Sequence, residues 1–352
     1  MERTTVEVYE AGARRWLEER PARFVDRAER LAAAVAPGAV RADLGSGAGK
    51  HLTHLGQPVL ALDAAWAMLA LGRSSSPGAW AVQADLEALP LRWGSLGGAW
   101  ARASYLHVPK GRLPYALAQL HRAMTVGAPF HATVMAGDGE GPLPDDEFPG
   151  RFFARWTPDA LVDVLVGAGF TVESCDADGE WLHAWATRAR TLPDYVAPGL
   201  DLLVVGLNPS LYAADRGVGF ARPGNRFWPA ALAVGLVTRD RDPAHALVHH
   251  RVGMTDLVKR ATVGAAELTA DEYRAGLARL ERLVTWLRPR AVCVLGLAGW
   301  RAAKDRRAVA GEQAQGLAGV PVYLMPNPSG LNAQSSSASL AEHLRAALAL
   351  GR

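Results

Sequence analysis

The sequence predicts an α/β protein with two domains, a doubly wound Rossmann-like domain followed by a smaller α/β sandwich. The chain has 352 residues, of which 49% are hydrophobic, enough for two separate cores. Apolar runs alternate with helical patterns over residues 39–135, as in a mostly parallel sheet covered by helices. Residues 187–200 contain prolines and a glycine without a clear period, which is typical of a linker. Domains are therefore expected at residues 1–186 and 201–352.

The first domain is expected to contain five strands before a late helix–strand unit at residues 151–174. Each candidate strand is a short apolar run that lies between segments with a helical pattern. The candidates are residues 40–45, 58–63, 79–85, 98–104 and 129–135.

The second domain is expected to contain short buried strands with helices between and after them. The strand candidates are residues 200–208, 288–296 and 320–326. The helix candidates are residues 227–236, 271–287 and 335–350. This alternation gives a second, smaller α/β sandwich.

Several classes of protein are excluded by composition. The apolar runs are interrupted well before 18 residues, so no transmembrane helix is expected. The N-terminus, MERTTVEVYEAGARRW, lacks the apolar core of a signal peptide. Cys175 and Cys293 form no CxxC pair, which argues against a disulfide framework, a zinc site or an iron–sulfur cluster. We therefore expect a cytoplasmic protein without a bound metal.

The charge is distributed unevenly along the chain. Residues 1–195 carry 19 lysines and arginines against 23 aspartates and glutamates, whereas residues 196–352 carry 19 against 12. A basic C-terminal half suits a polyanionic partner such as DNA. An arginine-rich, solvated surface is the alternative interpretation.

A glycine-rich turn follows the first candidate strand. Residues 42–49 read ADLGSGAG, and glycines in such a turn let a ligand approach the backbone closely. Asp63 ends the second candidate strand, where a carboxylate can accept hydrogen bonds from ribose hydroxyls. Asp85 ends the third candidate strand, so acidic residues follow three strands in register with the turn.

This arrangement resembles the class I S-adenosylmethionine-dependent methyltransferases over residues 5–185. The resemblance implies that Asp43, Gly45 and Gly47 face the methionine and ribose of S-adenosylmethionine. It also implies that Asp63 binds the ribose hydroxyls and that Asp85 lies near the adenine.

The methyl acceptor is not identified by the sequence. The chain lacks the Asn/Asp-Pro-Pro-aromatic motif of adenine-amino DNA methyltransferases, and neither cysteine follows a proline, so DNA methylation is disfavoured. His107 follows the fourth candidate strand and is a candidate base, because imidazole titrates near neutrality. A purely structural histidine is the alternative.

A second set of motifs begins where the strand candidate at residues 200–208 ends. Pro209 fixes its own φ and biases Asn208 toward an extended backbone, which holds an amide at the end of a strand. Asparagine is not basic enough to take a proton, but its carbonyl oxygen can orient a water. An oriented water suffices when the sugar develops oxocarbenium character, as in cleavage of a glycosidic bond.

Two loops complete this set. Phe220 lies in the glycine-flanked stretch 217–224, where an exposed ring can stack on a flipped base. Residues 225–228 are expected to begin a helix. Residues 327–332 carry Pro, Ser and Gly around one apolar residue, Leu331, which suits a wedge between base pairs. Taken singly, these features also fit a turn asparagine, a core phenylalanine and a leucine that tucks into the core.

Together and in this order, the segments resemble the mismatch-specific uracil/thymine DNA glycosylases over residues 192–350. The resemblance implies a uracil-DNA-glycosylase-like sandwich in which Asn208 positions the water and Phe220 stacks on the base, with Ser210 and Asn225 beside it. The implied DNA-wedging loop consists of Asn327, Ser329, Gly330, Leu331 and Asn332. The chain departs from the family at Ser210, where glycine is usual, and at Asn332-Ala333, where a small polar residue and Arg are usual.

The sequence therefore predicts a monofunctional glycosylase, without a cofactor, that acts on G·U and related mismatches in double-stranded DNA. It is fused to an S-adenosylmethionine-dependent methyltransferase of unknown acceptor, and the chain is expected to associate with the nucleoid through DNA. Phosphate contacts are expected from Arg216, Arg222, Arg226 and Arg260. In one alternative the C-terminal domain binds nucleic acid without releasing a base. In another, the N-terminal domain is only a scaffold.

Overall fold

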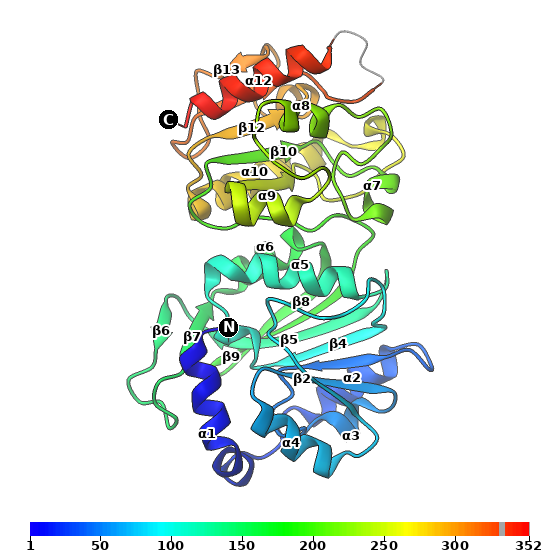
Figure 1. Cartoon of the computed structure of the whole chain (residues 1–352), viewed down its shortest axis with the longest axis vertical. Coiled ribbons are helices and arrows are strands. Elements are labelled where there is room, and N and C mark those ends of the chain that lie inside the picture. Colours follow the sequence, from blue (N-terminus) through cyan, green and yellow to red (C-terminus); the bar gives the residue numbers. More distant parts are fainter. Residues whose placement is uncertain (331–334, 352) are drawn as a thin grey trace. The chain divides into compact units, whose positions relative to one another are not determined.

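The computed structural model describes residues 1–330 and 335–351 and divides into two compact units, Met1–Ala189 and Arg190–Arg352 (Figure 1). Each unit is an α/β structure built on its own sheet, which confirms the predicted fold class. Among the described residues, no helix combines the length and hydropathy that a membrane span requires.

The first unit is built on a nine-stranded sheet with the order β3-β2-β1-β4-β5-β7-β6, in which β9 lies antiparallel to β5 and pairs with β8. Its strands are β1 (Arg41–Leu44), β2 (Val59–Asp63), β3 (Trp80–Gln83), β4 (Gly98–Arg102), β5 (Pro129–Ala136), β6 (Glu140–Pro142), β7 (Phe152–Trp156), β8 (Phe170–Asp178) and β9 (Trp181–Arg188). Strands β1 to β5 are parallel, so the carboxyl ends of β1, β2 and β4 meet at one edge.

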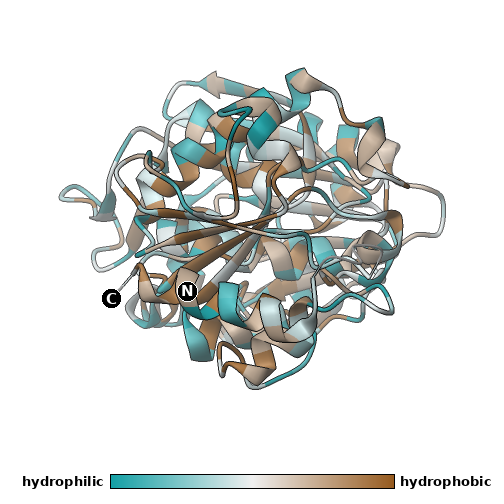
Figure 2. Cartoon of the chain, turned by 90° about the horizontal axis from the view of Figure 1, so that it is seen from above, coloured by the Kyte–Doolittle hydropathy of each residue, from teal (hydrophilic) through white to brown (hydrophobic). Residues whose placement is uncertain are grey.

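Helices pack on the sheet of the first unit. They are α1 (Arg3–Glu19), α2 (Val25–Ala34), α3 (Leu52–Leu55), α4 (Trp66–Ser75), α5 (Leu113–Ala123) and α6 (Pro158–Gly167), with short 3₁₀ turns at Tyr105–His107 and Lys110–Arg112. Leu31, Leu55 and Leu69 from α2, α3 and α4 share a buried cluster with Trp100 of β4. These three helices therefore bury their apolar sides against the sheet. In Figure 2, hydrophobic strands, drawn brown, cross the interior of the view.

The second unit has a five-stranded sheet with the order β11-β10-β12-β14-β13, parallel except for β13. Its strands are β10 (Leu202–Gly206), β11 (Val252–Asp256), β12 (Val292–Leu295), β13 (Gly311–Glu312) and β14 (Val322–Met325). Strand β11 was not among the predicted strands. Its five residues include Gly253 and Asp256, which weaken the apolar signal of a strand.

The helices of the second unit are α7 (Leu211–Arg216), α8 (Phe227–Ala233), α9 (Pro243–His250), α10 (Ala270–Leu287), α11 (Ala298–Ala303) and α12 (Ser337–Ala349), with a 3₁₀ turn at Ala265–Glu267. The rings of Phe227 and Trp228 in α8 are fully buried and share a core with Val204 of β10 and Leu340 of α12. A capping box between Thr269 and Glu272 starts α10, as the sequence pattern favours.

Much of the stretch that the sequence predicted as a linker is packed within the two units. Strand β9 runs to Arg188, and residues 191–196 are buried. Tyr195 exchanges two backbone hydrogen bonds with Met254 of β11, at 2.9 and 2.8 Å. These bonds tie the start of the second unit to the edge of its sheet.

Candidate functional sites

The glycine turn after β1 is so tightly packed that only glycine fits at its first position. Gly45 has a φ of 71°, and its amide donates to the Leu62 carbonyl at 2.7 Å. A Cβ atom at Gly45 would lie 2.3 Å from the Cβ of Ser104. The turn therefore approaches the end of β4 more closely than any side chain would allow.

The carboxyl group of Asp63 is held by this turn. Its Oδ2 accepts from the Gly47 amide at 2.8 Å, and its Oδ1 accepts from the Ala65 amide at 2.9 Å. Burial raises the pKa of Asp63 to about 6, although these amide bonds favour the carboxylate. Asp63 thus stands rigidly at the end of β2, beside the glycine turn.

Asp43 has a buried carboxyl oxygen that lacks a partner. It is 2% exposed, and within the described residues its Oδ2 receives no hydrogen bond. Burial, with a smaller contribution from the nearby Asp63, raises the pKa of Asp43 to about 8. A buried carboxyl oxygen without a donor fits a ligand that brings an amine or a hydroxyl, as S-adenosylmethionine does.

A cavity of about 300 Å³ brings most of the predicted methyltransferase residues together. It is lined by Asp43, Gly45, Gly47, Asp63 and His107, among others. The remaining residue of the prediction, Asp85, does not line this cavity. Its carboxylate accepts from the α-amino group of Met1 at 2.8 and 3.0 Å.

His107 is nearly inaccessible and both of its ring nitrogens are engaged. The histidine is 3% exposed, Nδ1 lies 2.6 Å from the Phe152 carbonyl oxygen, and Nε2 lies 2.8 Å from the Tyr9 hydroxyl. Because a carbonyl only accepts, Nδ1 carries the proton and Nε2 accepts from Tyr9. Burial lowers the pKa of His107 to about 4, so the imidazole is neutral near pH 7. The Tyr9 hydroxyl therefore separates His107 from any acceptor.

Asn208 follows β10 in the second unit, and its amide is fixed in one orientation. Its Nδ2 donates to the Arg260 carbonyl at 3.0 Å and to the Thr262 hydroxyl at 2.8 Å. Within the described residues, no group donates to Oδ1 of Asn208, which leaves this oxygen as an acceptor for a ligand or a water.

Ser210 caps a helix. Its hydroxyl accepts from the Ala213 amide at 3.2 Å as the N-cap of α7, and Leu211 donates to the Thr262 carbonyl at 3.1 Å. The hydroxyl therefore has a local backbone partner, which gives a structural reason for serine after Asn-Pro.

Phe220 has a strained backbone and lies close to the end of β10. Its φ is 58°, which is uncommon for a bulky residue, and the Trp228 indole fixes the preceding Gly219 carbonyl at 2.8 Å. The ring packs at 4.5 Å from the Phe227 ring and remains half-buried. A Cβ atom on Gly206 would lie 3.3 Å from Cζ of Phe220, so this glycine makes room for the ring.

The loop that holds Phe220 is tied to the loop after β14. The Arg226 amide donates to the Pro328 carbonyl at 2.9 Å, and its guanidinium donates to the carbonyls of Ser329, at 2.8 Å, and Ser335. Arg226, predicted to contact a phosphate, thus binds backbone carbonyls within and after the predicted DNA-wedging loop. The Oδ1 of Asn225 accepts from the Phe227 amide at 2.9 Å, so Asn225 caps the turn into α8.

The described part of the wedging loop is closely packed. Asn327 Oδ1 accepts from the Ser329 amide at 2.9 Å, and a Cβ on Gly330 would lie 2.7 Å from the Gly224 carbonyl oxygen. The three segments singled out from the sequence therefore meet at the carboxyl edge of this sheet. The predicted wedge residues Leu331 and Asn332 lie outside the described residues.

Asp256, which sequence analysis did not single out, lies at the same edge. It ends β11 opposite Gly206, is 8% exposed, and its Oδ1 occupies the space 2.3 Å from where a Gly206 Cβ would be. Within the described residues, no group donates a hydrogen bond to its carboxyl. Burial raises the pKa of Asp256 to about 6. The sequence signal that could have identified Asp256 is its position as an acidic residue at the end of β11, a strand that was not predicted.

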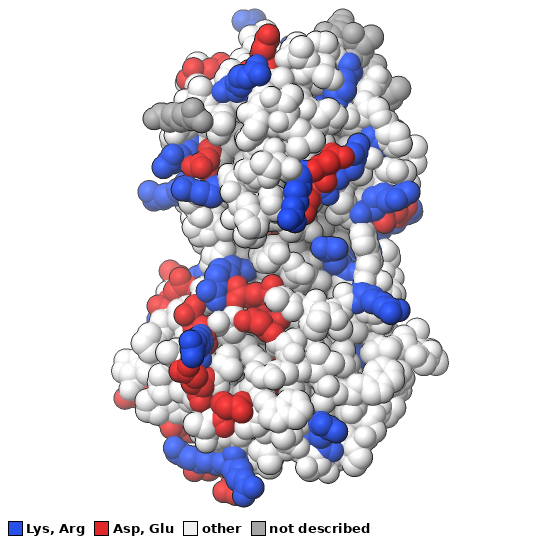
Figure 3. Space-filling view, in the orientation of Figure 1, with Lys and Arg blue, Asp and Glu red and all other residues white. Residues whose placement is uncertain are grey.

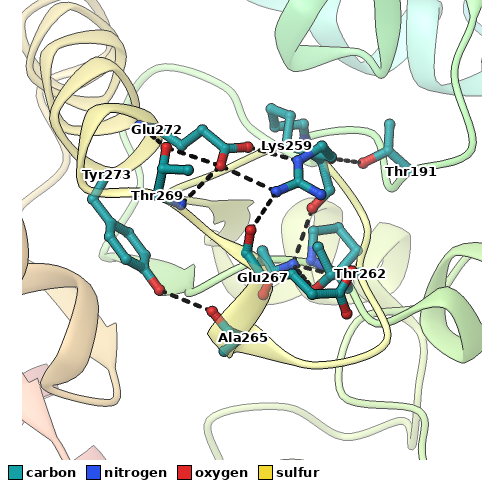
Figure 4. A network of polar contacts seen from close by, with 11 residues as sticks. Thr191, Lys259, Thr262, Ala265, Glu267, Thr269, Glu272 and Tyr273 are labelled. Carbon is teal, nitrogen blue, oxygen red and sulfur yellow. Dashed lines mark hydrogen bonds and ion pairs between the residues drawn. The ribbon is translucent and has the colours of Figure 1, made fainter.

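Arg260, predicted to contact a phosphate, is engaged within the loop between β11 and α10. Its guanidinium pairs with Glu272 at 2.6 Å and donates to the Glu267 carbonyl at 2.9 Å. Glu272 also accepts from the Thr269 amide at 2.9 Å at the start of α10 (Figure 4). This network fixes the loop whose Arg260 carbonyl and Thr262 hydroxyl hold Asn208.

Among the described residues, no group of acidic, histidine and cysteine side chains of the kind that holds a metal is present.

Comparison with known families agrees with both resemblances at the level of superfamily. Residues 193–350 match the uracil DNA glycosylase superfamily, and residues 42–131 match a methyltransferase domain. The chain thus carries a domain of each kind, a glycosylase-superfamily domain and a methyltransferase domain, as the two resemblances predicted at this level.

Several solved structures of methyltransferases are similar to the chain. One is the 1,6-didemethyltoxoflavin-N1-methyltransferase of Burkholderia thailandensis, 21% identical, covering 52% of this chain and 85% of that one, with a TM-score of 0.43. Another is the CcbJ methyltransferase of Streptomyces caelestis, 15% identical, covering 52% and 98%, with a TM-score of 0.43. A third, from Mesorhizobium loti, is 21% identical, covers 47% and 100%, and has a TM-score of 0.37.

Proposed function

We propose that the second unit is a monofunctional DNA glycosylase that removes uracil opposite guanine from duplex DNA, with thymine and ethenocytosine as further substrates. The observation that carries this proposal is the fixed amide of Asn208. The Arg260 carbonyl and the Thr262 hydroxyl hold its Nδ2, so its Oδ1 stays free as an acceptor after β10, at the sheet edge where Phe220 and the loop 327–330 meet.

The proposed reaction requires little proton transfer to or from protein side chains. A uracil base leaves its sugar as a stabilised anion, and the sugar develops oxocarbenium character as the glycosidic bond breaks. A water held by Oδ1 of Asn208 adds to C1′ and gives its proton to the departed base or to solvent, so no strong base is required. Phe220 stacks on the flipped base, and Leu331 fills the gap that the base leaves in the duplex.

We assign Asp256 to the recognition of the departing base. Its carboxyl and the Phe220 ring approach the same point next to Gly206, so a base stacked on Phe220 meets Asp256. Burial holds the pKa of Asp256 near 6, and the protonated form donates a hydrogen bond to a base carbonyl. A donor at that position stabilises the negative charge that develops on the base.

Single-turnover base release from a labelled duplex tests the glycosylase. The full chain is given G·U, A·U, G·T and single-stranded uracil, beside the variant Asn208→Ala. We expect release from G·U, reduced at least about a hundredfold in Asn208→Ala because the water loses its position. The variants Thr262→Val and Thr262→Ser form a matched control, since only serine keeps the acceptor for Nδ2 of Asn208. Intact DNA binding without release from any duplex would support a nucleic-acid-binding domain instead.

For the first unit we propose an S-adenosylmethionine-dependent methyltransferase. Asp63 suits the ribose hydroxyls, and Asp43 with Gly45 suits the methionine end; Asp85 is assigned to the adenine side from the resemblance alone. S-adenosylmethionine bound there would supply an electrophilic methyl group. If His107 acts as the base, the acceptor's proton reaches it through the Tyr9 hydroxyl, which occupies Nε2.

Calorimetric titration with S-adenosylmethionine tests this assignment. We expect binding to the full chain and an affinity at least about tenfold lower for Asp63→Ala, which removes a charge-assisted acceptor for the ribose. Asp176→Ala, on β8 and outside the cavity lining, is the matched control. If the folded wild-type chain gives no heat of binding, the methyltransferase assignment fails and the first unit is interpreted as a scaffold.

A further inference from the structure

The cavity of the first unit contains a guanidinium without an acidic partner. Arg102 is the last residue of β4 and lines the cavity beside Ala103 and Ser104. Its Nε is buried without a hydrogen bond, and no carboxylate in the described part of the chain forms an ion pair with it.

Three other cationic side chains along the cavity have partners, and a fourth, Arg23, is exposed to solvent. Arg151 forms an ion pair with Asp146, and its Nη1 donates to the Tyr9 hydroxyl at 2.9 Å. Arg20 pairs with Glu147, and Lys50 donates to the Leu17 carbonyl at 2.8 Å. Partial burial without any partner among the described residues thus distinguishes Arg102 from these neighbours.

The surroundings of Arg102 disfavour its charge. Burial lowers the pKa of Arg102, the nearby Arg23 and Arg20 lower it further, and Tyr9 and Asp43 oppose this shift only in part. A buried charge without a counter-ion is costly, and a complementary anion removes that cost. The planar guanidinium fork matches a carboxylate best, because it can form two parallel hydrogen bonds.

The walls around this guanidinium are aromatic and the backbone beside it is strained. The rings of Phe24 and Trp181 lie 5.7 and 5.8 Å from the guanidinium carbon. Ala103 has a φ of 53°, a left-handed conformation that is uncommon outside glycine and asparagine. Strain of this kind concentrates at ligand sites. An anion with an apolar body fits these surroundings.

We infer that the methyl acceptor of the first unit is a small acid whose carboxylate pairs with Arg102 and whose apolar body lies against Trp181. The inference rests on the proposed methyltransferase function. The cofactor takes the part of the cavity between Asp43 and Asp63, and the acceptor takes the part around Arg102, Tyr9 and Trp181. The alternative partner for Arg102 is the methionine carboxylate of S-adenosylmethionine itself.

Two titrations distinguish these two carboxylates. The first measures S-adenosylhomocysteine binding to the full chain by calorimetry, for wild type, Arg102→Gln and Arg102→Lys. The second adds benzoate, or its neutral analogue benzamide, to the same proteins with and without S-adenosylhomocysteine, and follows the small molecule by ligand-observed NMR. Arg122→Gln is the control, because Arg122 lies over the Trp93 ring and not in the cavity lining.

We expect benzoate to bind at least about tenfold more tightly than benzamide in wild type and in Arg122→Gln, the preference of a charge-assisted pair. Arg102→Gln should abolish the preference, Arg102→Lys should keep part of it, and the affinity for S-adenosylhomocysteine should be unchanged in both.

Equal binding of benzoate and benzamide to wild type would overturn the inference, whether or not the variants fold. A tenfold loss of S-adenosylhomocysteine affinity in Arg102→Gln would also overturn it and assign Arg102 to the cofactor. If S-adenosylhomocysteine does not bind wild type, the methyltransferase proposal fails, and the titrations without it still decide whether Arg102 binds a carboxylate.

Discussion

The orientation of the Asn208 amide depends on residues that lie more than fifty positions away in the sequence. The Asn-Pro motif places the side chain at the end of β10, but the Arg260 carbonyl and the Thr262 hydroxyl decide which atom remains free. Asp256 shows the same dependence, because the absence of a side chain at Gly206 gives its carboxyl a place beside Phe220. The chemistry of each residue therefore follows from its neighbours across the sheet edge.

This placement of Asp256 predicts how base release depends on pH. With a pKa near 6, the carboxyl is protonated and donates below that pH, and above it the carboxylate repels the departing anion. The single-turnover rate should therefore fall as the pH rises through about 6, provided that uracil release is measured before product dissociation. The charged groups near Asp256 are Lys259, Arg279 and Asp194, which are themselves paired.

Two substitutions at this position give opposite results. Asp256→Asn keeps a donor that does not titrate, so its rate should show no fall with pH. Asp256→Ala removes the donor, so its rate should be low throughout, by about ten- to a hundredfold, the worth of a hydrogen bond to a charged group. An unchanged pH profile in Asp256→Asn would assign the titration to another group.

At the scale of elements, the alternation of strand and helix was predictable because parallel strands buried on both faces read as short apolar runs. The five strand candidates of the first domain correspond to β1 to β5. Strand β11 was not predicted, because it is short and contains Gly253 and Asp256. The loop after β11, which orients Asn208, was therefore not recognised either. The position of β11 and of the loop after it depends on tertiary contacts, which a local sequence pattern does not encode.

Arg226 illustrates the same limit. The sequence placed it at the start of a helix, and α8 does begin at Phe227. Its guanidinium was expected to contact a phosphate, because an arginine near a DNA-binding motif suggests that function. Carbonyls of Ser329 and Ser335, about a hundred residues away in the chain, take its donors instead. These hydrogen bonds connect the end of the Phe220 loop to the predicted DNA-wedging loop.

At the scale of the whole molecule, the uneven charge of the two halves overstates the number of cations available to DNA. Arg260 pairs with Glu272, Arg279 and Lys259 pair with Asp194, and Arg274 pairs with Asp271. Several basic side chains of the second unit lie against acidic ones on the face shown in Figure 3. Arg222 differs, because it is exposed in the loop beside Phe220.

The salt dependence of DNA binding tests this distinction. Each phosphate contact adds about 0.9 to the slope of the logarithm of affinity against the logarithm of salt concentration, because it releases counter-ions. We expect Arg222→Gln to lower the slope by about that amount, whereas Arg260→Gln leaves it unchanged because Glu272 already neutralises Arg260. Fluorescence anisotropy with an undamaged labelled duplex and the full chain measures the slopes without turnover. A slope near zero in wild type would mean that the basic C-terminal half does not bind DNA phosphates. An equal decrease of the slope in both variants would mean that Arg260 leaves Glu272 when DNA binds.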